Sequence, residues 1–271
     1  MSELPSVVFL GTPAVAETTL RALCSAGVPV PLVVTAPDKR RGRGNAIQPS
    51  PVKAAALELG LAVTDDPNDV LAVEADLGVV VAYGRIIRPP LLAKLPMVNL
   101  HFSLLPRWRG AAPVERAILA GDERTGVCLM AVSEGLDEGG VYARAETRIG
   151  DKTLDQLRDE LVGLGDQLLL AALRDGLGVP EPQIGAAVYA HKLTVEDRHI
   201  DWDATPEQIL RVIRLGDAWT TFRDKRIKMI DACLGESGEV APVTVQPEGK
   251  GPMAFDSWRN GTRPAPGEWF S

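Results

Sequence analysis

The sequence predicts an α/β fold: a mostly parallel sheet with helices on both faces, followed by a small β-rich unit. Three short apolar runs, over residues 6–11, 30–35 and 77–82, are separated by segments in which apolar residues have helical spacing. Runs that are apolar at every position are typical of parallel strands buried on both faces. Strands that alternate with helices in this way predict a Rossmann-like sheet.

The same reasoning places the other elements of this first unit. Gly27 and Gly60 end the first two helices, because glycine readily adopts the left-handed conformation that terminates a helix. In chain order we expect a strand at 6–11, a helix at 14–26, a strand at 30–35, a helix at 52–59, strands at 61–63 and 77–82, a short helix within 86–95, a strand at 98–101, a helix at 114–120, strands at 126–132 and 141–147, and an amphipathic helix at 153–174.

The chain is expected to continue through a linker into a second, smaller domain. The proline-marked segment Val179-Pro-Glu-Pro-Gln183 indicates that transition. The predicted divisions are a main domain over residues 1–178, a linker over 179–200 and a C-terminal β-rich domain over 201–271.

The C-terminal domain carries two local signals. Residues 206–215 predict a short helix with Thr205 as its N-cap, because threonine accepts from a free N–H at a helix start. Residues 221–230 predict a β-hairpin with its turn near Arg223. The remainder is rich in glycine and proline and has little periodicity, which indicates a small β structure.

Composition places the chain among ordinary globular proteins. Of its 271 residues, 45% are hydrophobic and 24% are charged. No stretch reaches the ~18 consecutive apolar residues that a membrane-spanning helix needs. The N-terminus, Met-Ser-Glu-Leu-Pro, lacks the basic start and apolar core of a secretion signal, so we expect a cytoplasmic protein with no membrane partner.

The cysteines predict neither disulfides nor a metal site. Cys24, Cys128 and Cys233 are odd in number, far apart and without metal-binding spacing. We interpret all three as buried thiols and expect no metal.

A short basic segment stands out against a formal net charge of −7. Residues 39–43 read Lys-Arg-Arg-Gly-Arg, and Lys53 follows. Nucleic-acid binders are usually basic overall, so the net charge argues mildly against such a partner. A local basic loop can nevertheless bind phosphates, because salt screens distant charges beyond ~10 Å. The alternative interpretation is a solvated surface loop.

Three polar residues form a candidate catalytic site. Asn99 and His101 lie two positions apart at the carboxyl end of a predicted strand, so their side chains share one face. Open α/β sheets bind ligands beyond the carboxyl ends of their strands. Asp137 follows in a loop with three glycines. An amide can donate to an oxyanion, an imidazole can take a proton and a carboxylate can orient the imidazole, so the set predicts a transfer reaction.

Each of these residues also has a structural interpretation. A single histidine at a strand end can serve only core hydrogen bonds, and an aspartate between glycines can serve only a turn. Arg107 and Arg109 flank Trp108 and can form a surface cation–π cluster. The first strand ends in Gly11-Thr-Pro, which is not the dinucleotide fingerprint, so a nicotinamide-dependent dehydrogenase is disfavoured.

Several longer segments resemble a known family. They are Phe9-Leu-Gly-Thr-Pro13, Pro37-Asp38 with Gly42-Arg-Gly44, Pro49-Ser-Pro-Val-Lys53, Val80-Val-Ala-Tyr-Gly84, Asn99 through Pro113, Gly135-Leu-Asp137, Tyr189-Ala-His-Lys-Leu193 and Ile200-Asp-Trp202. With them the chain resembles the methionyl-tRNA formyltransferases, within the wider family of formyl-tetrahydrofolate-dependent transferases. The likeness runs along most of the chain and is best through residues 7–147. The string Ser103-Leu-Leu-Pro-Arg-Trp-Arg-Gly-Ala-Ala-Pro113 and the basic loop favour the tRNA enzymes over relatives acting on sugar nucleotides or on glycinamide ribonucleotide.

The resemblance implies formyl transfer from 10-formyltetrahydrofolate, as co-substrate, to the α-amine of initiator methionyl-tRNA in translation initiation, by a protein that we expect to be a monomer. The catalytic residues that it implies are Asn99, His101 and Asp137. The implied folate contacts are Ser103, Leu104, Leu105 and Pro106, with Tyr83 and Gly84 nearby. The implied tRNA contacts are Arg40, Arg41, Arg43 and Lys53, with Arg43 as the leading contact. The implied C-terminal domain is a partial OB-like barrel.

The C-terminal part departs from the family pattern, because residues 201–271 are short for a complete barrel. This departure keeps a second acceptor open: another primary amine, such as an amino-sugar nucleotide or an amino acid of a secondary metabolite. A third hypothesis, an RNA-binding or regulatory protein that kept only the fold, is disfavoured by the intact set of Asn99, His101 and Asp137.

Overall fold

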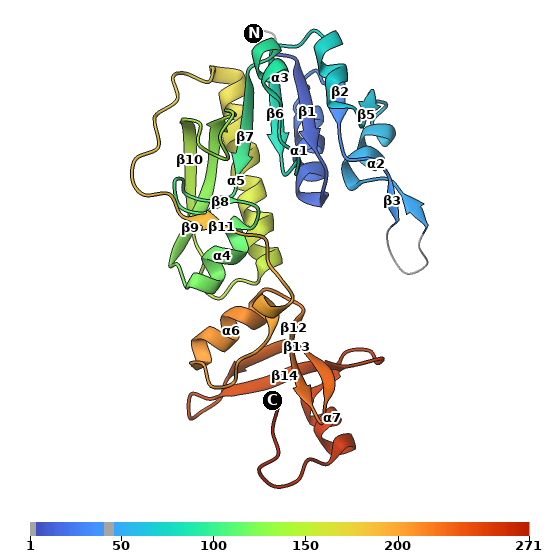
Figure 1. Cartoon of the computed structure of the whole chain (residues 1–271), viewed down its shortest axis with the longest axis vertical. Helices are drawn as coiled ribbons and strands as arrows, with labels where there is room; N and C mark the ends of the chain where they lie inside the picture. Colours follow the sequence, from blue (N-terminus) through green and yellow to red (C-terminus); the bar gives the residue numbers. More distant parts are fainter. Residues whose placement is uncertain (1–3, 41–45, 271) are drawn as a thin grey trace. The chain divides into compact units, whose positions relative to one another are not determined.

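The structure, a computed structural model, describes residues 4–40 and 46–270 and confirms the predicted α/β class (Figure 1). The main sheet has seven strands in the order β10-β9-β7-β6-β1-β2-β5. These strands are β1 (Val7–Gly11), β2 (Leu32–Val34), β5 (Val63–Thr64), β6 (Leu77–Val81), β7 (Met97–His101), β9 (Arg124–Ala131) and β10 (Val141–Arg148). Five neighbouring strands, from β7 to β5, are parallel, and β9 runs antiparallel to β7.

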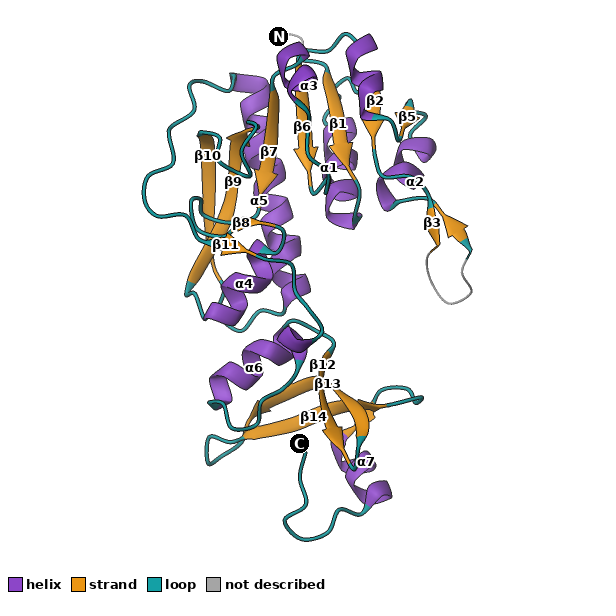
Figure 2. Ribbon diagram, viewed as in Figure 1, coloured by secondary structure: helices purple, strands orange, loops and turns teal. Residues whose placement is uncertain are grey.

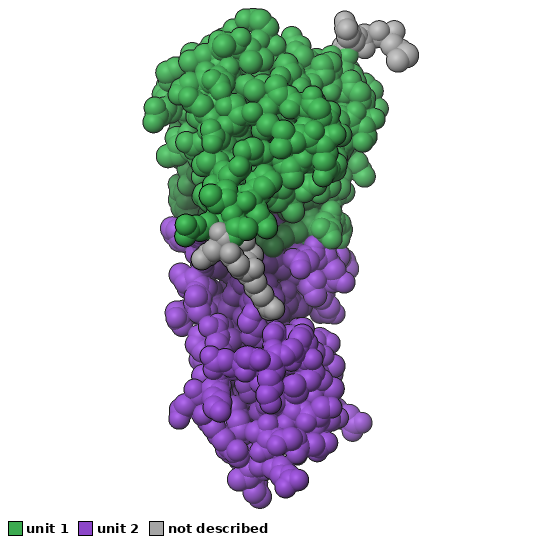
Figure 3. All heavy atoms as spheres, turned by 90° about the vertical axis from the view of Figure 1, so that its right-hand side faces the viewer, with its two compact units in different colours: residues 1–113, 125–147, 158–190 green, residues 114–124, 148–157, 191–271 purple. Residues whose placement is uncertain are grey.

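The chain folds into two compact units, which Figure 3 colours separately. Among the described residues, unit 1 takes the chain up to Pro113 together with Thr125–Thr147 and Arg158–Ala190. Unit 2 takes Val114–Arg124, Arg148–Leu157 and the chain from His191 onward.

The two faces of the main sheet are buried by different helices, as the alternation along β1 shows. Val7 and Phe9 face a core formed with α1 (Ala14–Ser25), α2 (Pro51–Glu58) and the unit 1 part of α5 (Leu154–Asp175). Val8 and Leu10 face the other core, beside α3 (Pro89–Lys94) and the 3-10 helix η1 (Pro67–Ala72). All four side chains are fully buried, which explains why the run is apolar at every position. Figure 2 shows the strands of the main sheet and the helices beside them in separate colours.

The parallel strands end together at one edge of the sheet. In the register, Gly11 of β1 lies beside Val81 of β6, and Val80 lies beside Asn99 of β7. Beyond these ends, the Thr12 hydroxyl donates to the Tyr83 carbonyl at 3.2 Å and ties two of the loops together. The edge therefore carries the loops on which a ligand site is expected.

The helix starts in α2 and α6 follow from side-chain caps. The Ser50 hydroxyl accepts from the Lys53 N–H at 3.0 Å at the start of α2. Thr205 caps α6 (Pro206–Arg214) in a capping box with Gln208, which confirms the predicted cap.

Unit 2 is built on an antiparallel sheet in the order β12-β13-β14-β15. Its elements after α6 are β12 (Ala218–Phe222), β13 (Lys225–Leu234), β14 (Val240–Pro247), β15 (Met253–Ala254) and α7 (Phe255–Thr262). The predicted hairpin is β12–β13, and its turn residues Arg223 and Asp224 have φ values of 49° and 61°. Two left-handed residues give a turn whose twist matches that of the strands.

Some elements differ from the sequence prediction. The α7 helix was not expected in a segment rich in glycine and proline; its aromatic residues Phe255 and Trp258 bury against the sheet. Residues Lys39–Arg40 (β3) pair with Ile47–Gln48 (β4) as a small hairpin. The prediction of three buried thiols was wrong for Cys233, which is exposed because it lies near the end of a strand at the unit surface, and Cys24 is only partly buried.

A bidentate ion pair latches the C-terminal tail of unit 2. The Arg223 guanidinium donates to both Glu268 carboxylate oxygens, at 2.6 and 2.7 Å, and the Ala265 N–H donates to Glu268 at 2.8 Å. The hydrogen bonds from Arg223 lower the pKa of Glu268 to about 2. Next to the latch, Phe270 stacks on Trp202, with ring centroids 5.3 Å apart.

We predict that Glu268→Gln loosens this tail at neutral pH. A carboxylate with a lowered pKa stabilises the folded state above its ordinary pKa of 4.5, and that contribution is lost as the pH falls toward 2. In the wild type, the protection of residues 264–270 against hydrogen–deuterium exchange, measured relative to the intrinsic rate at each pH, should therefore fall as the pH is lowered from 4.5 toward 2. The variant should exchange fast already at pH 7. The matched control Glu248→Gln changes an exposed glutamate away from the latch, and slow exchange in Glu268→Gln would contradict the role of the ion pair.

Candidate active site

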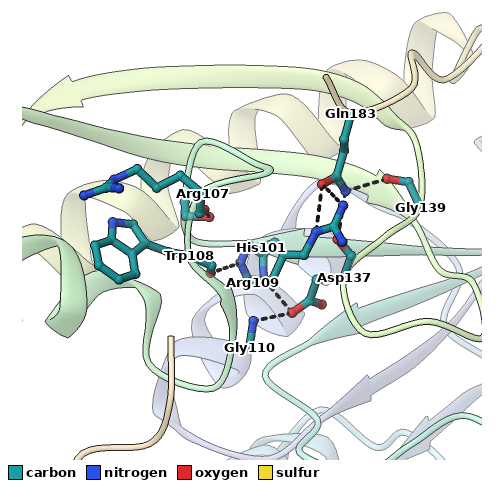
Figure 4. A network of polar contacts seen from close by, with 9 residues as sticks. His101, Arg107, Trp108, Arg109, Gly110, Asp137, Gly139 and Gln183 are labelled. Carbon is teal, nitrogen blue, oxygen red and sulfur yellow. Dashed lines mark hydrogen bonds and ion pairs between the residues drawn. The ribbon is translucent and has the colours of Figure 1, made fainter. Parts of the chain in front are cut away.

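The side chains of His101 and Asp137 meet at the carboxyl edge of the main sheet (Figure 4). His101 ends β7, and Asp137 lies in the loop of residues 135–140 between β9 and β10. Nδ1 of His101 is 3.5 Å from Oδ2 of Asp137, and the two side chains are only 6% and 16% exposed. The glycine-rich loop thus brings a carboxylate to the imidazole from far along the chain.

The hydrogen bond made by Nε2 of His101 determines which ring nitrogen carries the hydrogen. Nε2 lies 2.8 Å from the carbonyl oxygen of Trp108. A carbonyl can only accept, so Nε2 carries a hydrogen and donates it. Nδ1 is therefore the position at which His101 gains or releases a proton, and it faces the carboxylate of Asp137.

The segment Trp108–Gly110 contacts both side chains through its backbone. The Trp108 carbonyl accepts from His101, and the Gly110 N–H donates to Oδ2 of Asp137 at 2.7 Å. Trp108 has a φ of 66°, a left-handed conformation that is costly for a bulky residue and is found most often at functional sites. The strand β8 (Arg109–Gly110) pairs in parallel with β11 (Tyr189–Ala190), which holds the segment in place.

The loop of residues 135–140 is shaped by close backbone contacts. Asp137 itself has a φ of 51°. A Cβ on Gly139 would lie 1.8 Å from the carbonyl oxygen of Ala131, so only glycine fits there. The side-chain amide of Gln183 donates to the carbonyls of Asp137 and Gly139, both at 2.8 Å.

Asn99 lies on the same face of β7 as His101, because the two are separated by one residue in a strand. Its side chain is half-buried. Among the described residues its amide has no hydrogen-bond partner, so both N–H groups can bind a ligand.

Two of the predicted folate contacts, Ser103 and Leu105, are buried inside the turn that follows β7. The Ser103 hydroxyl is fully buried and donates to the Arg107 carbonyl at 2.6 Å. Leu105 packs in a cluster with Cys128, where burial raises the pKa of the Cys128 thiol. These two side chains shape the turn.

The neighbouring residues Leu104 and Pro106 are half-buried. Leu104 packs against Gly126, where a Cβ would meet its Cδ2 at 2.5 Å. The Pro106 carbonyl accepts from the Val188 N–H at 3.3 Å.

The other two predicted folate contacts, Tyr83 and Gly84, directly follow β6. The Tyr83 ring is 4% exposed and packs in the core beside α3, and burial raises the pKa of its hydroxyl. Gly84 is exposed with a φ of 75°. Gly84 and the Tyr83 backbone therefore lie at the edge of the sheet, and the Tyr83 ring does not.

Of the four predicted tRNA contacts, the structure describes Arg40 and Lys53. Arg40 is exposed on β3, in the hairpin that extends from the sheet beyond β2 (Figure 1). Lys53 lies in the first turn of α2, and its Nζ forms an ion pair with Asp38 at 2.8 Å. Arg41 and Arg43 lie outside the described residues.

Over residues 4–40 and 46–270, no three histidine, cysteine or acidic side chains are grouped so as to hold a metal ion. In the same part of the chain, no helix has the length and apolarity needed to cross a bilayer.

Sequence reasoning missed several contributors to this site: the Trp108 carbonyl, the Gly110 N–H, and the side chains of Arg109 and Gln183. The predicted cation–π contact forms with Arg107, whose Cζ lies 4.4 Å from the Trp108 ring centroid. Arg109 turns instead to Gln183, donating from Nε at 3.1 Å and from a terminal nitrogen at 2.8 Å. Gln183 lies in the segment that was predicted to be a linker, where a lone glutamine gives no signal.

Comparisons with known proteins show the family of the chain. Residues 6–173 match the family described as formyl transferase. The methionyl-tRNA formyltransferase of Heliobacterium modesticaldum is 44% identical over 255 residues, which cover 87% of this chain and 80% of that protein. The methionyl-tRNA formyltransferase of Jannaschia sp. is 39% identical over 297 aligned positions, covering 96% of this chain and 98% of that protein.

The solved structure of a methionyl-tRNA formyltransferase from Clostridium thermocellum has the same fold. It superimposes with a TM-score of 0.61 at 15% sequence identity and covers 92% of this chain and 100% of that chain. The fold, the family match over more than half of the residues and the relatives at 39–44% identity lead to one conclusion: the chain belongs to the formyl transferase family.

Proposed function

We propose that this chain transfers a formyl group from 10-formyltetrahydrofolate to the α-amine of methionine esterified to initiator tRNA, a step of translation initiation. The observation that supports this most is the meeting of His101 and Asp137 beside Asn99 at the sheet edge. The reaction belongs in the cytoplasm, where charged tRNA is used, and we expect the chain to act as a monomer.

The residues present suit the charges that develop in such a transfer. Formyl-folate, when bound, supplies the activated one-carbon unit. A C–N bond forms between the amine and the formyl carbon, the C–N bond to the folate breaks, and a proton of the amine passes to the departing nitrogen. Negative charge develops on the formyl oxygen meanwhile. A site for this reaction therefore needs an N–H donor, a proton acceptor and a group that stabilises a proton in transit.

Each catalytic role falls on one of the three side chains. Asn99 donates an N–H to the oxygen on which negative charge develops. His101 holds or releases a proton at Nδ1, since its Nε2 is already bound to the Trp108 carbonyl. The carboxylate of Asp137 stabilises the proton on Nδ1 through Oδ2.

A second acceptor class has support from chain length. The alignment with the Jannaschia protein spans 297 positions, more than the 271 residues of this chain, so that relative carries segments that this chain lacks. Unit 2 has an open four-stranded sheet among the described residues. The absence of those segments supports, as the alternative, a primary amine such as an amino-sugar nucleotide or an amino acid of a secondary metabolite. A competition assay that offers methionyl-tRNA together with a panel of free amines separates the two.

We predict that Asn99→Ala lowers kcat for formylation of methionyl-tRNA by roughly 10²–10³-fold, because loss of one donor from an oxyanion site has that effect. Asp137→Asn should lower kcat by roughly 10²–10⁴-fold, because a neutral amide no longer stabilises the proton on Nδ1 of His101 during the transfer. Radiolabel transfer from formyl-folate to charged initiator tRNA measures this. Asn260→Ala, an exposed asparagine on α7, is the matched control and should keep full activity. Normal turnover in both site variants would remove the catalytic assignment.

We predict that Arg40→Ala and Arg43→Ala raise KM for methionyl-tRNA and leave kcat nearly unchanged. Each lost phosphate contact should also reduce the salt dependence of binding by roughly one unit of slope. The control Arg174→Ala removes an exposed arginine at the end of α5. If KM and salt dependence are unchanged in both variants, the basic hairpin does not bind the acceptor.

A further inference from the structure

The segment of residues 181–190, the strap, is bound at both ends to the elements that carry the catalytic side chains. At one end, Glu181 and Val141 exchange two backbone hydrogen bonds, at 2.8 and 2.9 Å, where β10 begins. At the other end, the Val188 carbonyl accepts from the Arg109 N–H at 2.8 Å, and Ala190 accepts from the backbone beyond Gly110. The strap therefore spans from the loop that bears Asp137 to the segment that bears Gly110.

Gln183 lies in the middle of the strap, and its amide is fully used. Nε2 donates both hydrogens, to the carbonyls of Asp137 and Gly139 at 2.8 Å. Oε1 accepts from two nitrogens of Arg109, at 3.1 and 2.8 Å. Carbonyls only accept and a guanidinium only donates, so the amide has a single possible orientation. No other side chain of this length offers two donors and an acceptor in that arrangement.

These bonds close a ring around the catalytic pair (Figure 4). His101 binds the Trp108 carbonyl, the Gly110 N–H binds Asp137, and Gln183 joins the Asp137 peptide to the Arg109 side chain. Arg109 lies between the two backbone groups that contact the catalytic side chains. The Arg109 side chain is 13% exposed, and its guanidinium also reaches Glu138 at 3.3 Å.

We propose that Gln183, acting with Arg109, is a positioning residue: it locks the loop of residues 135–140 so that the Asp137 carboxylate stays against Nδ1 of His101. Asp137 has a left-handed backbone that a free loop would abandon, because that conformation is costly for a residue with a side chain. The Gln183 bonds to the carbonyls on both sides of Glu138 oppose this relaxation. The inference rests on the proposed function for its effect on turnover.

The test uses three variants of the full chain. Gln183→Met keeps the length of the side chain and removes all four hydrogen bonds. Gln183→Glu keeps the acceptor for Arg109 and loses the two donors. Arg109→Lys loses the forked pair of donors. We expect kcat to fall roughly 10- to 100-fold in each, because a displacement of about 1 Å at a reacting group has that effect, while KM for formyl-folate changes little.

Three readouts distinguish positioning from a general structural role. The pH profile of kcat/KM in Gln183→Met should match that of Asp137→Asn. The double variant of Gln183→Met and Arg109→Lys should have a kcat no lower than that of the less active single variant, since both changes break the same ring of hydrogen bonds around His101 and Asp137. The control Gln246→Met, which removes a glutamine bound to one carbonyl in unit 2, should keep the wild-type kcat.

A fourth readout does not depend on activity. The chain has three histidines, so the ring-nitrogen NMR signals of His101 can be assigned with His101→Asn. In Gln183→Met the Nδ1 signal should move toward its position in Asp137→Asn. If the wild type transfers no formyl group, the proposed function fails, and this shift still tests the positioning role.

Wild-type kcat and an unmoved Nδ1 signal in Gln183→Met would overturn the proposal. If Gln183→Met fails to fold by circular dichroism, Gln183→Glu decides in the same way, because it retains the bond to Arg109. The proposal would also be overturned if Gln183→Met and Gln183→Glu lost activity while the pH profile of kcat/KM and the Nδ1 signal of His101 stayed as in the wild type.

Discussion

The site depends on one contact: the backbone of Trp108–Gly110 touches both His101 and Asp137. The carbonyl fixes the proton of the imidazole on Nε2, and the N–H holds the carboxylate at the other ring nitrogen. The strand or loop that carries each side chain does not fix that side chain in this position, because β7 ends at His101 and Asp137 lies in a loop. Pairing of β8 with β11 keeps this segment in place, and the strap extends the same constraint to the loop of residues 135–140.

The sheet supplies the fixed frame for this contact. Burial of both faces of β1 and its parallel neighbours leaves the strand ends as the positions where polar groups can face a ligand. Asn99 and His101 end such a strand, and their common face follows from the strand period. The left-handed backbone conformations of Trp108 and Asp137 direct the Trp108 carbonyl and the Asp137 carboxylate toward His101. Each conformation costs free energy, which the surrounding hydrogen bonds offset.

Membership in the formyl transferase family and the geometry at the sheet edge support the same chemistry. Unit 2 closes its core with a helix and a latched tail: Phe255 and Trp258 pack on the sheet, and Arg223 holds Glu268. This arrangement buries the side chains of Phe222, Phe255, Trp258 and Phe270 in the core of the unit. The basic hairpin at Arg40 remains the proposed contact for an acceptor that carries phosphates.

The sequence by itself determined the order of the strands of the main sheet and of the helices between them, the capped start of α6 and the hairpin at Arg223, because apolar spacing and capping residues act locally. It also indicated Asn99, His101 and Asp137, since side chains carry the chemistry. Only the tertiary structure decided what holds them. Backbone carbonyls and N–H groups are alike at every position, so the roles of Trp108 and Gly110 leave no mark in a sequence. The role proposed for Gln183 likewise arises only where distant segments meet.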